Sequence, residues 1–228
     1  MKENSNTFSM NSVTTGLSTL ILGFLNAYSA IYNHSTLISA QTGNLVNLGI
    51  ELSKGEIDSA ADNLCLLVGF GAGCTLAAVL ISECKKNWRF GWSVFSVIIW
   101  LSTVFNSILT SNLSVVVYSF LSGIALTFFR DFEKSNLNNG IMTGNLKNFY
   151  SYLVNFVLRH KREEAKLALD ILLLVLLFFL GSFLGGASAS LGKTAMLTGV
   201  SASCLLPYLI FWLKSRKEKM LKNGNYQE

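Results

Sequence analysis

The sequence predicts an all-α integral membrane protein with six transmembrane helices and two short re-entrant helices, arranged as two inverted repeats of three crossings each. The first observation is composition: the 228-residue chain is 51% hydrophobic and only 14% charged, whereas a soluble domain has about 25% charged residues. The second is that the apolar residues are gathered in blocks, and the third is a polar hexamer that occurs once in each half. A soluble helical bundle is the alternative, which the lengths of the blocks disfavour.

Six apolar blocks predict the crossings, because each reaches or approaches the roughly 20 residues that span a bilayer. The blocks are Val13–Tyr32, Ala60–Ile81, Phe90–Leu109, Val115–Phe129, Leu167–Ala187 and Thr194–Leu213. The fourth block reaches this length together with Leu113 and Ser114. We expect Pro207 to kink the last crossing, since proline cannot donate the helical hydrogen bond.

The polar hexamer T-G-N-L-x-N stands at residues 42–47 and again at residues 143–148. From the first copy a helical stretch covers only about residues 42–52, roughly 16 Å at 1.5 Å per residue, which is half a hydrocarbon core. This length predicts a re-entrant half-helix. The second copy, over about residues 143–158, is longer and contains Lys147, so a helix lying on the membrane surface is the alternative there.

The distribution of basic residues selects the topology. With six crossings, 16 of the 18 Lys and Arg residues lie on one side of the membrane, and only Lys54 and Lys193 lie on the other. With eight crossings the division is 11 to 6, and Lys147 is left inside the membrane. Because basic residues accumulate on the cytoplasmic side, we expect a multi-pass protein of the cell membrane with both termini cytoplasmic.

Each half therefore contains one re-entrant segment and three crossings, and this odd number predicts that the second half is inverted relative to the first. Glycine spacing supports the duplication: Gly23 lies 20 residues before Gly43, and Gly123 lies 21 residues before Gly144. The predicted organisation is a cytoplasmic tail over 1–12, a first repeat over 13–112, a second repeat over 113–213 and a basic cytoplasmic tail over 214–228.

The two hexamers form the predicted substrate site. Threonine is a good helix N-cap, and glycine and asparagine tolerate the irregular backbone at a helix start. Helix starts that enter from opposite faces would direct their N–H groups and positive dipole ends to the midplane, where they could hold an anion, a carboxylate or a polar solute and repel cations. The candidate residues are Thr42, Gly43, Asn44, Asn47, Thr143, Gly144, Asn145 and Asn148. The alternative is that these polar groups cap each other and only hold the halves together.

Three polar residues inside or beside the apolar blocks are secondary candidates: Asn26, Asn106 and Asp170. The two asparagines either line a cavity or bridge helices. Asp170 lies four residues after Lys166, so an ion pair is the alternative to a proton relay. The four cysteines show no CxxC spacing, so we predict no metal site, no disulfide and no cofactor.

The stretches "LGFLNAYSAI" and "SAQTGNLVNLGI", followed by a glycine-rich crossing, resemble the YoaK-type family of bacterial membrane proteins, a domain of unknown function with the T-G-N signature in each half. The resemblance covers about residues 13 to 213, and its most specific part is the first T-G-N stretch with Gly23–Ala27 upstream. It implies an acidic residue where Asn26 stands and a Gln-Asn pair where Ile124 and Ala125 stand. These departures argue against a proton-coupled role for the first crossing of each half.

The predicted function is a transporter or channel for a small polar or anionic solute. The alternative is a membrane structural or accessory protein in which the hexamers only hold the halves together. An enzyme is the third and weakest class, because H-E-x-x-H, G-x-S-x-G and paired intramembrane aspartates are absent from the sequence, so we predict no catalytic residues. The expected partners are the lipid bilayer and a small solute but no nucleic acid, and a homo-oligomer stays open.

Overall fold

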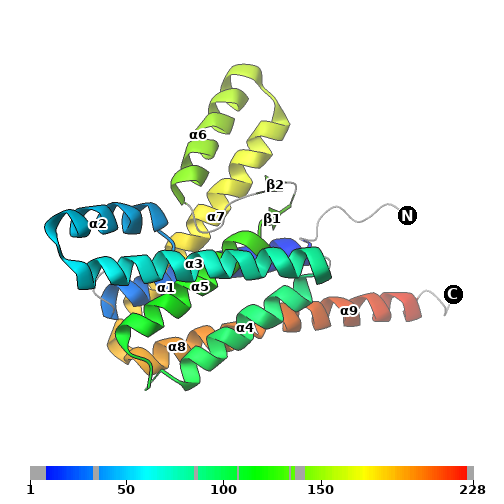
Figure 1. Cartoon of the computed structure of the whole chain (residues 1–228). Helices are drawn as coiled ribbons and strands as arrows, with labels where there is room; N and C mark the ends of the chain where they lie inside the picture. Colours follow the sequence, from blue (N-terminus) through cyan, green and yellow to red (C-terminus); the bar gives the residue numbers. More distant parts are fainter. Residues whose placement is uncertain are drawn as a thin grey trace.

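The computed structural model describes residues 9–32, 36–84, 87–106, 108–133, 135–136 and 142–224, and these are almost entirely helical (Figure 1). The helices are α1 (Met10–Tyr32), α2 (Gln41–Lys54), α3 (Ile57–Cys84), α4 (Trp88–Val104), α5 (Ser111–Phe128), α6 (Met142–Arg159), α7 (Arg162–Ala187), α8 (Lys193–Ser203) and α9 (Leu206–Gly224), with a 3₁₀ turn η1 (Ala189–Leu191). The predicted helical class is confirmed. Each predicted apolar block contains a helix, but the helix of the third block ends at Val104 and the sixth block is divided between α8 and α9.

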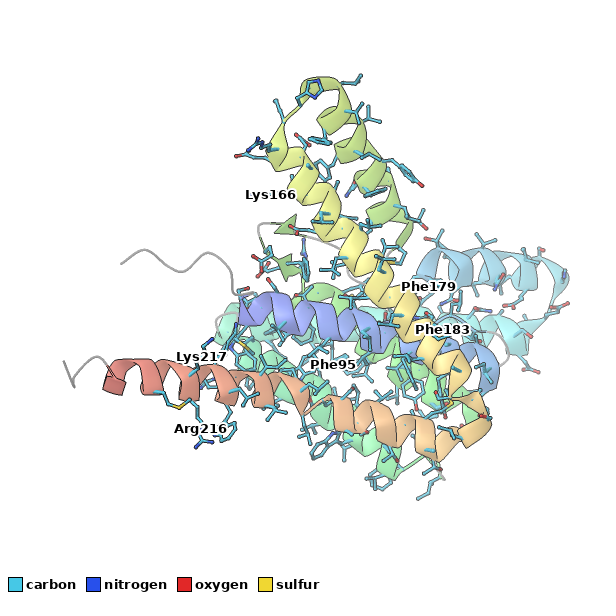
Figure 2. The ribbon with its side chains drawn as sticks, turned by 180° about the vertical axis from the view of Figure 1, so that it is seen from behind. Phe95, Lys166, Phe179, Phe183, Arg216 and Lys217 are labelled. Atoms are coloured by element: carbon cyan, nitrogen blue, oxygen red, sulfur yellow. The ribbon has the colours of Figure 1, made fainter. Side chains whose placement is uncertain are left out.

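Three helices of the described chain are long and apolar enough to cross a membrane: Ile57–Glu83, Arg162–Ala187 and Lys193–Lys217. A shorter apolar helix covers Asn112–Phe128. The surface agrees with a lipid environment, since Phe179 and Phe183 on α7 are 64% and 60% exposed (Figure 2). Large aromatic side chains in such exposed positions are costly in water and favourable in lipid. The chain is therefore a helical membrane protein.

Two close helix crossings hold the described structure together. Helix α1 packs along α7, and α3 packs along α5. In the first pair, a Cβ added at Gly23 would overlap the Phe178 carbonyl oxygen, and one at Gly181 would overlap the Leu20 carbonyl oxygen. Only glycine permits such an approach, and small residues are the usual means of close packing between membrane helices.

The second pair repeats this contact with different residues. A Cβ added at Gly73 would overlap the carbonyl oxygen of Phe120, and one at Gly123 would overlap that of Phe70. In both crossings each glycine faces the carbonyl of the residue three positions before the partner glycine. Gly23 and Gly123, which the glycine spacing matched in the sequence, thus occupy equivalent positions in the two helix pairs.

Aromatic residues fill the core beside these crossings. Trp92 and Phe95 are fully buried and contact the ring of Phe129. The Trp92 Nε1 donates to the Cys204 carbonyl oxygen at 2.8 Å. That carbonyl lies where α8 ends, before Pro207 at the second position of α9. The expected interruption at Pro207 is confirmed, and the freed backbone there is partly satisfied by α4.

A two-residue hairpin was not predicted by the sequence. Strands β1 (Asp131–Phe132) and β2 (Ser135–Asn136) pair in antiparallel fashion between α5 and α6. The Thr15 hydroxyl donates to the Asp131 carbonyl oxygen at 2.8 Å, which fixes this hairpin against α1. Figure 1 shows α6 and the adjoining part of α7 as a helical hairpin that stands away from the other helices.

Candidate functional site

The first T-G-N copy lies in the first turn of α2, but its threonine does not cap the helix. Helix α2 begins at Gln41, and its N-cap residue is Ala40, which makes no side-chain capping bond. The Ala40 carbonyl accepts hydrogen bonds from the N–H groups of Gly43 (2.9 Å) and Asn44 (3.2 Å). Thr42 is exposed inside the helix. The predicted threonine cap is wrong, because the helix starts one residue before it.

Gly43 is also inside regular helix, so the predicted irregular backbone at this position is wrong. A Cβ added there would have no atom within 4 Å. Gly43 instead borders a cavity, described below, together with Asn44 and Asn47. The absence of a side chain leaves the backbone of the first turn open on that side.

Asn44 is the only buried residue of α2 and is 5% exposed. Its Nδ2 donates to the Gln41 Oε1 at 3.1 Å. Gln41 in turn donates from Nε2 to the Ile38 carbonyl oxygen (2.8 Å) and to the Ser119 hydroxyl of α5 (3.1 Å). A polar network thus ties the start of α2 to α5, in agreement with the rule that buried polar groups find partners.

Asn26 on α1 fixes the segment that precedes α2. Its Nδ2 donates to the Leu22 carbonyl oxygen (2.8 Å) and to the Ser39 hydroxyl (3.0 Å), and its Oδ1 accepts from the Ser39 N–H (3.4 Å). Of the two roles predicted for Asn26, cavity lining and bridging, these bonds support bridging. Asn26 does not border the cavity.

The second T-G-N copy occupies the equivalent place at the start of α6, which begins at Met142. Asn145 is 1% exposed and is the only buried residue of this helix. It is engaged in an interaction, whereas Thr143 and Asn148 lie on the exposed side. Thr143 again follows the first residue of the helix, so it is inside the helix as Thr42 is.

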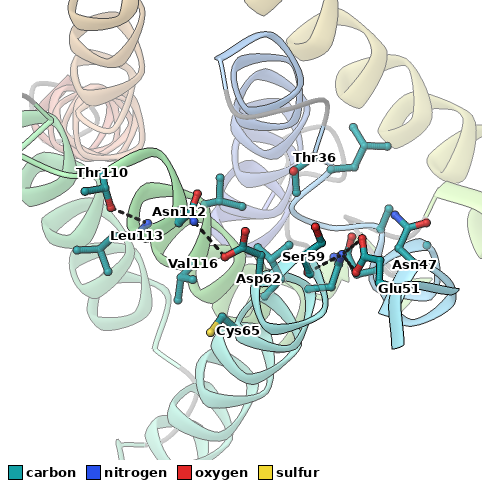
Figure 3. Close-up of a pocket in the computed structure, with 17 residues that line it drawn as sticks. Thr36, Asn47, Glu51, Ser59, Asp62, Cys65, Thr110, Asn112, Leu113 and Val116 are labelled. Atoms are coloured by element: carbon teal, nitrogen blue, oxygen red, sulfur yellow. Dashed lines mark hydrogen bonds between the residues drawn. The ribbon is translucent and has the colours of Figure 1, made fainter. Parts of the chain in front are cut away.

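A cavity of about 680 Å³ opens beside the first copy (Figure 3). It lies between α2, α3 and the start of α5. Its polar lining includes Asn44, Asn47, Glu51, Asp62, Asn63 and Asn112. This volume is in the range of small-molecule sites, which are about 300–1,000 Å³.

Two carboxylates of this lining are held by amide groups. The Asn63 Nδ2 donates to both carboxylate oxygens of Glu51, at 3.0 and 2.8 Å. The Asn112 Nδ2 donates to the Asp62 Oδ1 at 3.0 Å, joining α5 to α3. Figure 3 shows Glu51, Asp62 and Asn112 from these three helices around the same space.

The structure brings together only part of the predicted residue set. Gly43, Asn44 and Asn47 border the cavity, whereas Thr42 and the described residues of the second copy do not. Asn106 accepts a hydrogen bond from the Tyr28 hydroxyl at 3.2 Å in a different part of the structure. Asp170 is half-buried in α7 and has an interaction partner. In the described part of the chain, no group of three or more His, Cys, Asp or Glu side chains could hold a metal ion.

Sequence reasoning missed the residues that give the cavity its charge. Glu51 lies four residues after Asn47 and seven after Asn44, which places the three on one face of a helix. This spacing is visible in the sequence. The contribution of Asn112 is not, because it depends on α5 packing beside α3 across about 50 residues of chain.

A family model matches residues 15–210 of the chain, which include both T-G-N copies and all four crossing glycines. The chain belongs to the DUF1275 family. Its description is a protein of unknown function. The resemblance to YoaK-type proteins is consistent with this assignment. For this DUF1275 chain, comparisons with curated proteins and with solved structures found no match.

Proposed function

We propose that the protein is a transporter or channel of the cell membrane for a small polar solute, held at the starts of α2 and α6. The observation that carries this proposal is that each of these helices buries a single residue, the asparagine of its T-G-N hexamer. Half-buried side chains, such as Phe149 and Tyr152 on α6, also contact the rest of the protein. The asparagine is the one residue that each helix buries, and a buried amide in a membrane protein needs a hydrogen-bonding partner. The cavity beside Asn44 gives a solute access to one of the two amides.

The proposed architecture has six crossings and two re-entrant helices related by inversion. Its support is the equivalence of the two glycine crossings, in which the first long helix of each half packs on the second long helix of the other half. When helices of one inverted half pack on helices of the other, the halves can rock against each other. A site between them can then open to each side of the membrane in turn. Under this proposal, α2 and α6 enter the bilayer from opposite faces.

Both termini are proposed to be cytoplasmic, because this topology segregates the basic residues 16 to 2. The α6–α7 connection, with Lys161, would then be cytoplasmic, and Lys54 would be external. Single cysteines at these two positions, in a cysteine-free background, test the topology in intact cells. We expect a membrane-impermeant maleimide to label position 54 only. Labelling of position 161 from outside would contradict six crossings.

A structural role is the second candidate, and a specific observation favours it. The Gln41 side chain connects Asn44 to Ser119, and Asn26 binds Ser39, so the first hexamer is built into a network between α1, α2 and α5. In this alternative the asparagines hold the halves together and no solute is bound. Catalysis is not part of either proposal.

An uptake screen in reconstituted liposomes tests the transport function. The panel consists of radiolabelled small solutes of similar size that are cationic, neutral polar and anionic. We expect at least one to enter faster than it enters protein-free liposomes. A variant with Gly71→Ala, where an added Cβ meets no atom within 4 Å, serves as a folded control. Uptake at the protein-free rate for every solute would contradict the proposal and leave the structural role.

A further inference from the structure

We propose that the cavity between α2, α3 and α5 selects an organic cation, an ammonium group on a small apolar body. This inference rests on the proposed function in taking the cavity as the place where the solute first binds. It also changes the charge expected of the solute, since the sequence alone predicted a small polar or anionic solute and helix starts that repel cations.

The charge of the lining supports a cation. Glu51 and Asp62 both border the cavity, and none of the described residues that line it is a lysine, arginine or histidine. Among the described residues of the lining, a positive solute therefore meets two carboxylates and no cationic side chain. Opposite charges attract strongly where the surroundings are less polar than water.

The hydrogen-bonding groups have the same bias. The amide nitrogens of Asn63 and Asn112 already donate to the carboxylates, and that of Asn44 donates to Gln41. Their amide oxygens accept none of the hydrogen bonds found among the described residues. The lining also holds groups that can donate, such as the Asn47 amide and the Ser59 hydroxyl, so it is the free amide oxygens together with the two carboxylates that favour an N–H donor such as an ammonium ion.

The start of α2 does not reverse this preference. A helix start is equivalent to about half a positive charge. The N–H groups of Gly43 and Asn44 already bond to the Ala40 carbonyl. The two carboxylates of the cavity outweigh the partial positive charge at the start of α2. The anion that the sequence predicted for this helix start is therefore disfavoured in the cavity.

The size and the apolar part of the lining indicate an organic ion. A volume of about 680 Å³ is far larger than a metal ion needs. Leu66, Val115 and Val116 also border the cavity and give it an apolar wall. An ammonium group with a short hydrocarbon body would satisfy both surfaces.

Cys65 provides a reporter inside the cavity, because it borders the space and is an exposed free thiol. The purified protein in nanodiscs is treated with two methanethiosulfonates of similar size, one carrying a trimethylammonium group and one a sulfonate. Modification of Cys65 is followed by peptide mass spectrometry, and the ratio of the two rates is divided by the ratio measured on free cysteine. We expect a normalised ratio of about 10 in favour of the cationic reagent.

Four variants assign this preference to the cavity. Glu51→Gln with Asp62→Asn should bring the normalised ratio close to one, and each single change should lower it in part. Glu83→Gln removes the same charge from the opposite end of α3, where the side chain is exposed, and should leave the ratio unaltered. A wild-type ratio at or below one, or an equal ratio in the double variant, would overturn the inference.

A protection experiment compares n-butylammonium with butyrate, which have similar short hydrocarbon bodies and opposite charges. We expect n-butylammonium to slow the reaction of Cys65 with N-ethylmaleimide at least about threefold at a concentration where butyrate has no effect. Protection by butyrate equal to or greater than that by n-butylammonium would overturn the inference.

The two proposals can fail separately. A cationic preference at Cys65 without uptake of any solute in liposomes would contradict the transport function and not the cation-selective cavity. Uptake of an anion without cationic preference at Cys65 would contradict only the cation-selective cavity.

Discussion

Helices α2 and α6 begin with the same hexamer yet lie in different chemical surroundings. Both start one residue before the threonine and bury only the asparagine. Helix α2 has 14 residues and borders an acidic cavity, whereas α6 has 18 residues and ends at Arg159, beside further basic residues. The shared feature is the position of one amide against the core. The charged groups along the two helices differ: carboxylates border the cavity beside α2, and basic residues stand at the far end of α6.

The glycine crossings offer the largest test of this equivalence. Replacing Gly73 or Gly181 by alanine would place a Cβ on the carbonyl oxygen of the facing helix, and the two backbones would have to separate along their length. We expect each change to cost at least about 3 kcal/mol, or to abolish folding, because overpacking between rigid backbones has no cheap relaxation. Thermal unfolding in detergent, with expression level as a second readout, measures the loss.

Gly71 and Gly186 are the matched controls, one beside each crossing. A Cβ at either would meet no atom within 4 Å, so alanine there should leave stability unaltered or raise it by up to about 1 kcal/mol, since alanine is the better helix former. If Gly73→Ala were as stable as Gly71→Ala, the close α3–α5 crossing would be incorrect. If only one of Gly73→Ala and Gly181→Ala were destabilising, the two crossings would not be equivalent.

A second prediction concerns the hydrogen bonds by which Asn26 fixes the segment before α2. From the glycine spacing, Leu126 is the residue equivalent to Asn26. Replacing Asn26 by alanine removes its bonds to Leu22 and Ser39 and leaves a buried N–H without its acceptor. We expect a loss of about 1–3 kcal/mol in unfolding free energy. Asn47→Ala, at an exposed position of α2, is the control and should stay within about 0.5 kcal/mol. Equal stabilities of the two variants would show that the hydrogen bonds of Asn26 do not stabilise the fold.

The sequence predicted the main helices well because apolar blocks and glycine spacing are properties of contiguous residues. It also predicted that a helix begins at each T-G-N copy. The role of Thr42 was wrong, since a capping preference does not fix the first residue of a helix to within one position. The β1–β2 pair was missed because two-residue strands leave no periodicity. The cavity was missed because Asp62 and Asn112 become neighbours only when α3 and α5 pack.

Substitutions at the C-terminal ends of α2 and α6 are expected to alter the unfolding free energy least, and with opposite signs. Gly55 follows α2 with φ of 76°, and the N–H groups of Gly55 and Glu56 bond to the Leu52 and Glu51 carbonyls. His160 follows α6 with φ of 51° and donates its N–H to the Phe156 carbonyl. Left-handed backbone favours glycine by about 1 kcal/mol.

We therefore expect Gly55→Ala to destabilise the protein by about 1 kcal/mol and His160→Gly to stabilise it by up to about 1 kcal/mol. Differential scanning calorimetry of both variants measures the signs. A loss of stability in His160→Gly would show that the imidazole makes a contact worth more than the backbone strain.

Normalised uptake in asparagine variants tests the central claim, that the two buried amides hold the solute. Asn44→Ala, Asn145→Ala and the double variant are compared with the wild type, using a solute from the uptake screen and counting only folded protein, with melting curves measured beside it. Losing one hydrogen bond costs about 0.5–1.5 kcal/mol, or up to about 3 kcal/mol with a charged solute, so affinity should weaken roughly 3- to 150-fold in each single variant. Unaltered normalised uptake with a lowered melting temperature would contradict the claim and assign both asparagines to holding the fold.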